Sequence, residues 1–152
     1  MKEVKQYAKN IPDFEIKYKT GTVKKKTLTS SADAADVLRQ LYDSNTLEYT
    51  ESFILLLLNQ ANKTIGWEMI SKGGITGTVA DPRVILKTVL LSGAVNFMVS
   101  HNHPSGNLQP SKADKELTTK LKEAASFMEL KLIDHVIITA ESYFSFADEG
   151  LI

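Results

Sequence analysis

The sequence contains no cysteine in its 152 residues. A disulfide framework and a thiolate-ligated metal site are therefore both excluded, and any metal must be held by histidine and carboxylate side chains. Such a ligand set is more typical of a catalytic zinc than of a structural one. The 18 basic and 18 acidic residues cancel, so no global charge draws the chain to nucleic acid or anionic lipid.

Long apolar stretches are missing as well. Residues 1–5 lack the apolar core of a signal peptide, and no apolar run reaches the length that crosses a membrane. We therefore expect a cytoplasmic protein without membrane contact. Hydrophobic residues make up 43% and charged residues 24% of the chain, which is ordinary for a globular protein. We find no repeat, low-complexity segment or linker and expect one compact domain.

Strand patterns recur along the chain. Residues 53–58 form a continuous apolar run that predicts a strand buried on both faces. An asparagine-rich turn separates it from residues 65–70, which predicts a hairpin. Further strands are expected over residues 94–99, 130–139 and 143–146. Alternating Phe14, Ile16 and Tyr18 predict a half-exposed strand near the amino terminus.

Three helices are expected between these strands, each beginning at a residue type that caps helices. The first starts at Ser30 or Ser31, and the second runs from Asp81 to Gly93. The third starts at Ser111 and turns five apolar residues inward: Leu117, Leu121, Ala124, Ala125 and Met128. A helix between two buried strands indicates a crossover connection. The pattern predicts a mixed α/β (α+β) fold, with a layered central sheet flanked by helices.

Two other stretches offer weaker signals. The lysines at 24–26 fit a phosphate-binding patch, but a solvated loop or edge strand is the preferred interpretation. The glycine-rich connector at 73–77 matches neither the Walker nor the dinucleotide-binding spacing, so we interpret it as a flexible connector.

The most informative stretch is His101-Asn102-His103-Pro104, which follows a buried strand. Side chains alternate along an extended segment, so both histidines lie on one side and can point at one ion. Asp114 is a candidate third ligand in the first turn of the next helix. However, Ser111-x-x-Asp114 also has the spacing of a helix capping box, and both interpretations stay open from spacing alone.

These residues also carry a resemblance to a known family. His101-x-His103-Pro104, six further residues and Ser111-x-x-Asp114 resemble the JAMM (MPN+) metalloprotease motif. Within that superfamily the chain is similar to the RadC branch over roughly residues 30 to 150. The matches are residues 101–107, 110–111 and 114, the strand head Glu51-Ser52-Phe53, residues 77–83, and residues 132–135.

The resemblance implies a JAMM/cytidine-deaminase-like domain over residues 30–152, preceded by a strand region at 1–29. It implies Zn²⁺ held by His101, His103 and Asp114, with water in the fourth position. Glu51 is then the general base and acid, and Ser111 donates a hydrogen bond to the oxyanion. The implied activity is that of a zinc metallopeptidase, a hydrolase acting on a peptide or isopeptide substrate.

Several neighbouring residues have other interpretations. Glu51 heads a buried strand and lies either at an exposed lip or in a site; Glu48, Glu68 and Glu141 are rivals on composition only. Asn102 should point away from the histidines and tie the loop by hydrogen bonds. A buried Asp134–His135 pair either orients a ligand or is a satisfied polar pair, and we favour the latter.

A second hypothesis is a non-catalytic interaction module in DNA repair or mobile-element biology, with or without metal. RadC proteins have that association, but nothing here matches the amino-terminal helix-hairpin-helix region of longer members, and the neutral charge gives little support for direct DNA binding. Asn102 also replaces the Ser or Thr usual in deubiquitinating JAMM enzymes, which weakens a ubiquitin-type substrate. A zinc deaminase is excluded because it needs a Cys-x-x-Cys pair. Exposed edge strands would allow a homodimer.

Overall fold

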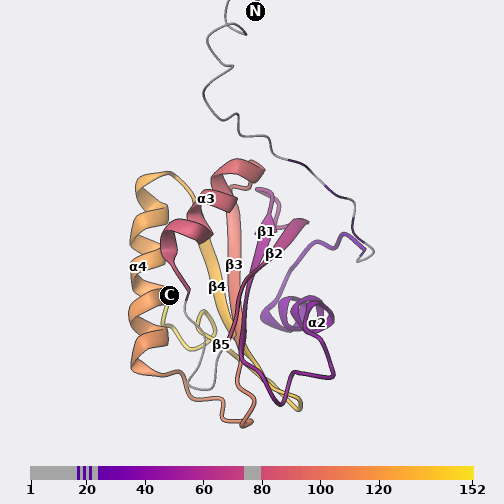
Figure 1. Ribbon diagram of the computed structural model, residues 1–152. Coiled ribbons are helices and arrows are strands. Elements are labelled where there is room, and N and C mark those ends of the chain that lie inside the picture. The colour runs from indigo at the N-terminus through magenta and orange to yellow at the C-terminus, as the bar shows by residue number, and fades with distance from the viewer. Residues whose placement is uncertain (1–16, 18, 20, 22–23, 74–79) are drawn as a thin grey trace, which may run out of the picture.

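A five-stranded mixed sheet forms the centre of the fold (Figure 1). The computed structural model describes residues 17, 19, 21, 24–73 and 80–152. The strand order is β2-β1-β3-β4-β5. The strands are β1 (Ser52–Leu58), β2 (Thr64–Lys72), β3 (Asn96–Asn102), β4 (Lys131–Ile138) and β5 (Tyr143–Ser145). The hairpin of β1 and β2 and the strands after residues 94 and 130 were all expected from the sequence.

Helices cover both faces of this sheet. Helix α2 (Ser31–Leu41) packs on one face, and α3 (Pro82–Ser92) and α4 (Lys112–Phe127) pack on the other (Figure 1). The layered mixed α/β architecture predicted from the sequence is therefore confirmed. None of the helices in the described part of the chain is long and apolar enough to cross a membrane.

The strand directions place α3 and α4 in crossover connections. Strand β1 is antiparallel to both β2 and β3, so α3 connects two parallel strands that lie on either side of β1. Strands β3 and β4 are parallel neighbours, and α4 crosses between them. Parallel neighbours need such a crossover, and the crossover helix starts beyond the carboxyl end of the first strand. Helix α4 therefore begins beside the last residues of β3.

The central strand β1 explains why the core has two halves. All seven residues of β1 are buried, because successive side chains point to opposite faces and both faces are covered. Ile54, Leu56 and Leu58 pack on the α2 side. Phe53, Leu55 and Leu57 pack on the α3 and α4 side. The continuous apolar run is thus used on both faces.

Helix termini follow the capping chemistry expected from the sequence. Ser30 caps α2, and its side chain accepts a hydrogen bond from the Asp33 amide. Asp81 caps α3, and Gly93 ends it with a left-handed φ of 72°, a conformation that favours glycine. One residue that was expected to face inward on the third predicted helix does not: Met128 is 48% exposed. It lies just beyond the last residue of α4, where the chain has already left the core.

Some expectations concern the amino-terminal part of the chain. The predicted strand at Phe14, Ile16 and Tyr18 lies outside the described residues, as does most of the glycine-rich connector. The boundary between residues 29 and 30 stays a prediction. The lysines at 24–26 are exposed and lie outside any named strand, and the Lys26 ammonium pairs with Asp33 at 2.7 Å.

Candidate metal centre

Three potential metal ligands gather at the carboxyl end of β3. His101 lies in the strand, His103 follows it, and Asp114 lies in the first turn of α4. Each offers one ligand atom, and these atoms all lie within 4.8 Å of one another. The two Nε2 atoms of the histidines are 2.9 Å apart. The arrangement can hold a metal ion.

The backbone around His103 explains why both histidines face the same way. The His103 amide donates to the Ile138 carbonyl, so the pairing with β4 continues one residue past the strand. The chain then turns, and the Gly106 amide donates to the His103 carbonyl at 3.0 Å. Gly106 has a φ of 81°, which glycine adopts without steric cost. His103 therefore keeps the extended alternation that starts at His101.

The capping box at the start of α4 aims the carboxylate of Asp114. The Ser111 Oγ accepts from the Asp114 amide at 3.0 Å, and the Asp114 Oδ2 accepts from the Ser111 amide at 2.7 Å. That same Oδ2 lies 3.4 Å from the Nε2 of His101 and 3.8 Å from the Nε2 of His103. The two interpretations of Asp114, cap and ligand, are therefore compatible.

Asp114 remains ionised in this setting. Partial burial raises its pKa, but the hydrogen bond and charge of His101 in its protonated form, with the hydrogen bonds of Ser111, hold the pKa of Asp114 below its usual range. The third potential ligand is thus an anionic oxygen. An anionic oxygen beside two imidazole nitrogens is a donor set that zinc accepts.

The hydrogen bonds of His103 indicate its tautomer. Its Nδ1 lies 2.5 Å from the carbonyl oxygen of Asn107. A carbonyl oxygen only accepts, so the Nδ1 must carry the hydrogen and donate it. In the neutral ring the Nε2 then has a lone pair, directed toward His101 and Asp114.

All three histidines of the chain meet here, because His135 of β4 lies behind His101. The His101 Nδ1 and the His135 Nε2 are 2.8 Å apart. Burial, with the charge of His101 as the next cause, lowers the pKa of His135 well below its usual value. Phe53, paired across the sheet with His101, stacks on its ring with an angle of 2° between the planes.

The adjacent residues Asp134 and His135 have different surroundings. Asp134 accepts hydrogen bonds from the Ser145 hydroxyl at 2.6 Å and the Ala147 amide at 3.0 Å, although its burial raises its pKa. It holds the carboxyl-terminal turn, as a structural polar residue does. His135 is also satisfied by hydrogen bonds, but one of its partners is a candidate ligand, His101. The alternation along β4 separates the two side chains.

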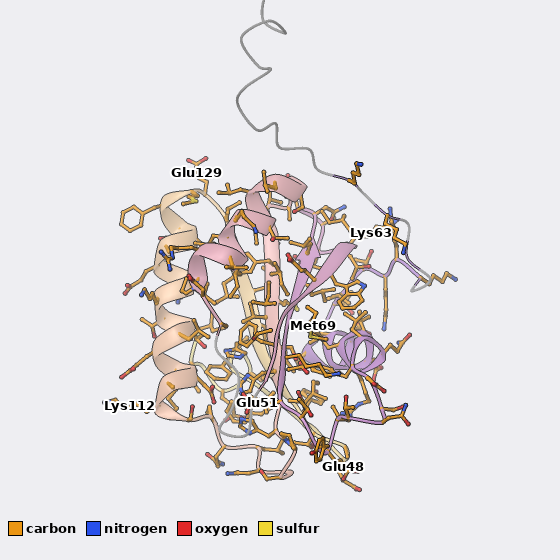
Figure 2. All side chains as sticks on the ribbon, viewed as in Figure 1. Glu48, Glu51, Lys63, Met69, Lys112 and Glu129 are labelled. Carbon is orange, nitrogen blue, oxygen red and sulfur yellow. The ribbon has the colours of Figure 1, made fainter. Side chains whose placement is uncertain are left out.

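Glu51 immediately precedes β1 at the same end of the sheet. Strand β1 pairs Phe53 with His101, and the same register continued by two residues places Glu51 opposite His103 on the same face. Figure 2 shows Glu51 at the end of the sheet from which α4 starts, where Lys112 is labelled. Glu51 is half-buried.

The rival carboxylates lie in less favourable places. Glu48 and Glu141 are exposed, and Glu68 pairs with Leu55 in the edge strand β2, two strands from β3. Among the four glutamates considered, Glu51 is the one that the strand register brings to the histidines.

Asn102 fixes the backbone on both sides of Glu51. Its Oδ1 accepts from the Ser52 amide at 2.7 Å, and its Nδ2 donates to the carbonyls of Leu47 and Thr50 at 2.7 and 2.9 Å. Its side chain is fully buried. The prediction that Asn102 ties the loop by hydrogen bonds is confirmed, and the loop it ties is the one that carries Glu51.

With this geometry established, comparison with known proteins identifies the family. The family described as RadC-like JAB domain matches residues 28–151. This chain belongs to that family. The resemblance in the histidine motif, the strand head and the Leu-x-Asp-His segment is therefore confirmed at the level of the family.

Individual relatives of this JAB domain carry names that state no activity. A UPF0758 protein of Flavobacterium johnsoniae is 44% identical over 129 residues, which are 85% of this chain and 55% of that protein. The UPF0758 protein YfjY of Escherichia coli is 38% identical over 102 residues, which are 67% of this chain and 64% of that protein. The chain spans about half the length of the curated relatives that it matches.

Sequence reasoning missed Thr118, a buried polar residue of this JAB domain that contacts His135. Thr118 lies one helical turn after Asp114, and its hydroxyl lies 2.6 Å from the Nδ1 of His135. The available signal was its spacing, because residues four apart share a helix face. Nothing else in the sequence distinguished Thr118 from a threonine that faces inward without a specific role.

Asn102 offers a direct test of this loop arrangement. Asn102→Ala leaves the Ser52 amide and two carbonyls without their buried partner, so the free energy of unfolding should fall by about 2–4 kcal/mol. Urea unfolding in the presence of a chelator measures this without any contribution from bound metal. Asn45→Ala is the control, since the side-chain amide of Asn45 donates to the nearby, exposed Asp43. Equal losses in the two variants would contradict the assignment.

Proposed function

We propose that this JAB domain is a zinc-dependent hydrolase that cleaves an amide bond in a peptide or isopeptide. One observation carries the proposal: His101, His103 and Asp114 present three ligand atoms within 4.8 Å of one another. Membership of the RadC-like JAB family supports the same reading. A set of three protein ligands leaves one coordination position open, as hydrolytic zinc sites do.

The chemistry of the donor atoms fits a cation. The lone pair of the His103 Nε2, the ring edge of His101 and the anionic Oδ2 of Asp114 face one another across 2.9 to 3.8 Å. Electron-pair donors at such distances need a proton or a metal ion between them. Zinc bound there would lower the pKa of a water ligand to about 7 and polarise a substrate carbonyl.

Glu51 would handle the protons of the reaction. Its carboxylate would take a proton from the attacking water and deliver it to the leaving amine, and a carboxylate within hydrogen-bond reach can do both. The register between β1 and β3 supports this role, because it brings Glu51 to the edge of the histidine pair. Asn102, which bonds on either side of it, would limit its movement.

Ser111 would stabilise the negative charge that develops on the substrate oxygen. Its Oγ accepts a hydrogen bond from the Asp114 amide, which leaves its hydroxyl hydrogen for donation. Ser111 is exposed to solvent, within three residues of Asp114. A donor held in place before the reaction stabilises an oxyanion without reorganisation. Capping and catalysis would thus use different parts of one hydroxyl.

Metal binding can be separated from helix capping with one substitution. Purified without chelators, the protein should contain close to one zinc per chain. Asp114→Asn keeps an oxygen that can accept from the Ser111 amide, so the metal-free stability should change little. Altering a residue that only hydrogen-bonds to a metal ligand typically lowers metal affinity by roughly 10- to 100-fold. Altering the ligand Asp114 itself should lower the zinc affinity by more than that. Chelator competition measures it, and an unchanged affinity would remove Asp114 as a ligand.

The role of Glu51 is tested by activity with metal retained. A peptide and isopeptide library, incubated with zinc-loaded protein and analysed by mass spectrometry, should reveal cleavage that Glu51→Gln reduces by about 10²- to 10⁴-fold. The variant should still hold its zinc. Glu48→Gln is the matched control and should keep full activity. Persistence of cleavage in the Glu51 variant would exclude Glu51 as the base.

A non-catalytic interaction module is the second candidate, and one observation favours it. A hollow of about 820 Å³ beside β2 is lined by four lysines, Lys17, Lys19, Lys25 and Lys87. Trp67, which is 44% exposed, also lines it. Lysines that contact phosphates and an aromatic ring that stacks on a base are the elements of single-strand binding.

This second candidate predicts a specific salt dependence. If all four lysines contact phosphates of a single-stranded oligonucleotide, the logarithm of the affinity should fall with the logarithm of the salt concentration with a slope of about −3. Lys87→Ala should flatten that slope, whereas Lys112→Ala, at the other end of the sheet, should not. Fluorescence anisotropy measures both. Affinity that is absent or insensitive to salt would exclude this candidate.

A further inference from the structure

A buried chain of hydrogen bonds runs behind the candidate ligand His101. The His101 Nδ1 contacts the His135 Nε2 at 2.8 Å, and the His135 Nδ1 contacts the Thr118 hydroxyl at 2.6 Å. The same hydroxyl contacts the backbone carbonyl of Asp114 at 2.6 Å. His101, His135 and Thr118 are each at most 1% exposed. The chain thus begins at one candidate ligand and ends at the backbone of another.

Chemistry gives every bond in this chain a direction. A carbonyl oxygen only accepts, so Thr118 must donate its single hydrogen to Asp114. The Thr118 oxygen then accepts from the Nδ1 of His135. The partners of the two His135 ring nitrogens are thus the Thr118 hydroxyl and the ring of His101. Neither is a carboxylate, so a buried, doubly protonated and positively charged His135 would be costly. The Nε2 of His135 therefore has a lone pair.

That lone pair determines the state of His101. It can be satisfied only if the Nδ1 of His101 carries a hydrogen and donates it. In the neutral ring the Nε2 of His101 then has a lone pair directed toward His103 and Asp114, which is the form that binds metal. The Asp114 carbonyl, through Thr118 and His135, thus dictates which nitrogen of His101 faces the centre.

We propose that His135 and Thr118 are positioning residues that hold His101 in its metal-binding tautomer and orientation. The proposal rests on the metal-dependent function proposed above and extends it to two residues outside the histidine motif. The two residues come from β4 and α4, so they also couple the strand that carries His101 to the helix that carries Asp114.

Packing fixes the ring of His135 in the plane that this role requires. Phe146 stacks on it with ring centroids 4.6 Å apart and 12° between the planes. Phe53 contacts it edge-on at 5.8 Å and also stacks on His101. Because both rings are enclosed, His101 would lose little rotational freedom when metal binds. Hydrogen-bond partners of ligating histidines act in this way and commonly influence metal affinity by about 10- to 100-fold.

Substitution of His135 tests the proposal through metal affinity. His135→Leu fills the buried position with an apolar side chain but removes the hydrogen-bond acceptor for His101. The zinc dissociation constant should therefore rise by about 10- to 100-fold. His135→Gln can place an oxygen near the former Nε2 and should recover part of that loss. Chelator competition with Zn²⁺ and the absorption spectrum of the Co²⁺-loaded protein are the readouts. Circular dichroism with chelator present checks the fold.

Thr118 provides a second test that leaves His135 in place. Thr118→Val should weaken zinc binding by roughly 3- to 10-fold, less than His135→Leu because it acts one bond further away. Thr119→Val is the matched control, since the Thr119 hydroxyl also bonds the carbonyl four residues before it but is exposed. In the zinc-loaded wild type, ¹⁵N NMR should show His135 protonated at Nδ1.

The outcomes separate this proposal from the function on which it rests. Wild-type protein that binds no zinc would overturn both. Wild-type binding with unchanged affinity in His135→Leu and Thr118→Val, or a His135 protonated at Nε2, would overturn the positioning role alone. If His135→Leu does not fold, the comparison of Thr118→Val with Thr119→Val decides: equal affinities overturn the role, and a loss confined to Thr118→Val supports it.

Discussion

The carboxylate of Asp114 links the start of helix α4 to the end of strand β3, and the rest of the centre depends on that link. Its Oδ2 closes the capping box with the Ser111 amide and lies 3.4 Å from the Nε2 of His101. A side chain that satisfies an otherwise unpaired amide of the helix start is already held in place before any ion arrives. One local interaction thus stabilises the helix and orients a candidate ligand.

The topology of the sheet brings distant residues to this link. Because β3 and β4 are parallel neighbours, α4 must cross over them, and the carboxyl end of β3, the start of α4 and the side chains of β4 meet at one place. Because β1 is antiparallel to β3, the first residues of β1 arrive at that same end. Glu51 and His135 are far from the histidine motif in sequence, yet both lie near this end of β3.

Buried polar side chains hold the arrangement in register. Asn102 and His135 sit on opposite faces of the sheet, in or beside β3, and each satisfies several hydrogen bonds. A buried polar group without partners is costly, so each network tolerates few alternative arrangements. Hydrogen bonds between polar groups therefore position the side chains of the candidate centre, whereas the apolar core holds the sheet and helices together.

The sequence by itself determined the elements, the mixed layered fold, the histidine motif and its family, because hydrophobic periodicity, capping residues and motif spacing are local properties of the chain. It left Asp114 divided between cap and ligand, ranked Glu51 above its rivals only through resemblance, did not reveal the contact of His135 with His101 and passed over Thr118. Those questions depend on strand register and on which face of β4 meets α4. Only the tertiary structure decided which of these residues lie together, because contacts between residues tens of positions apart are set by pairing and packing rather than by spacing.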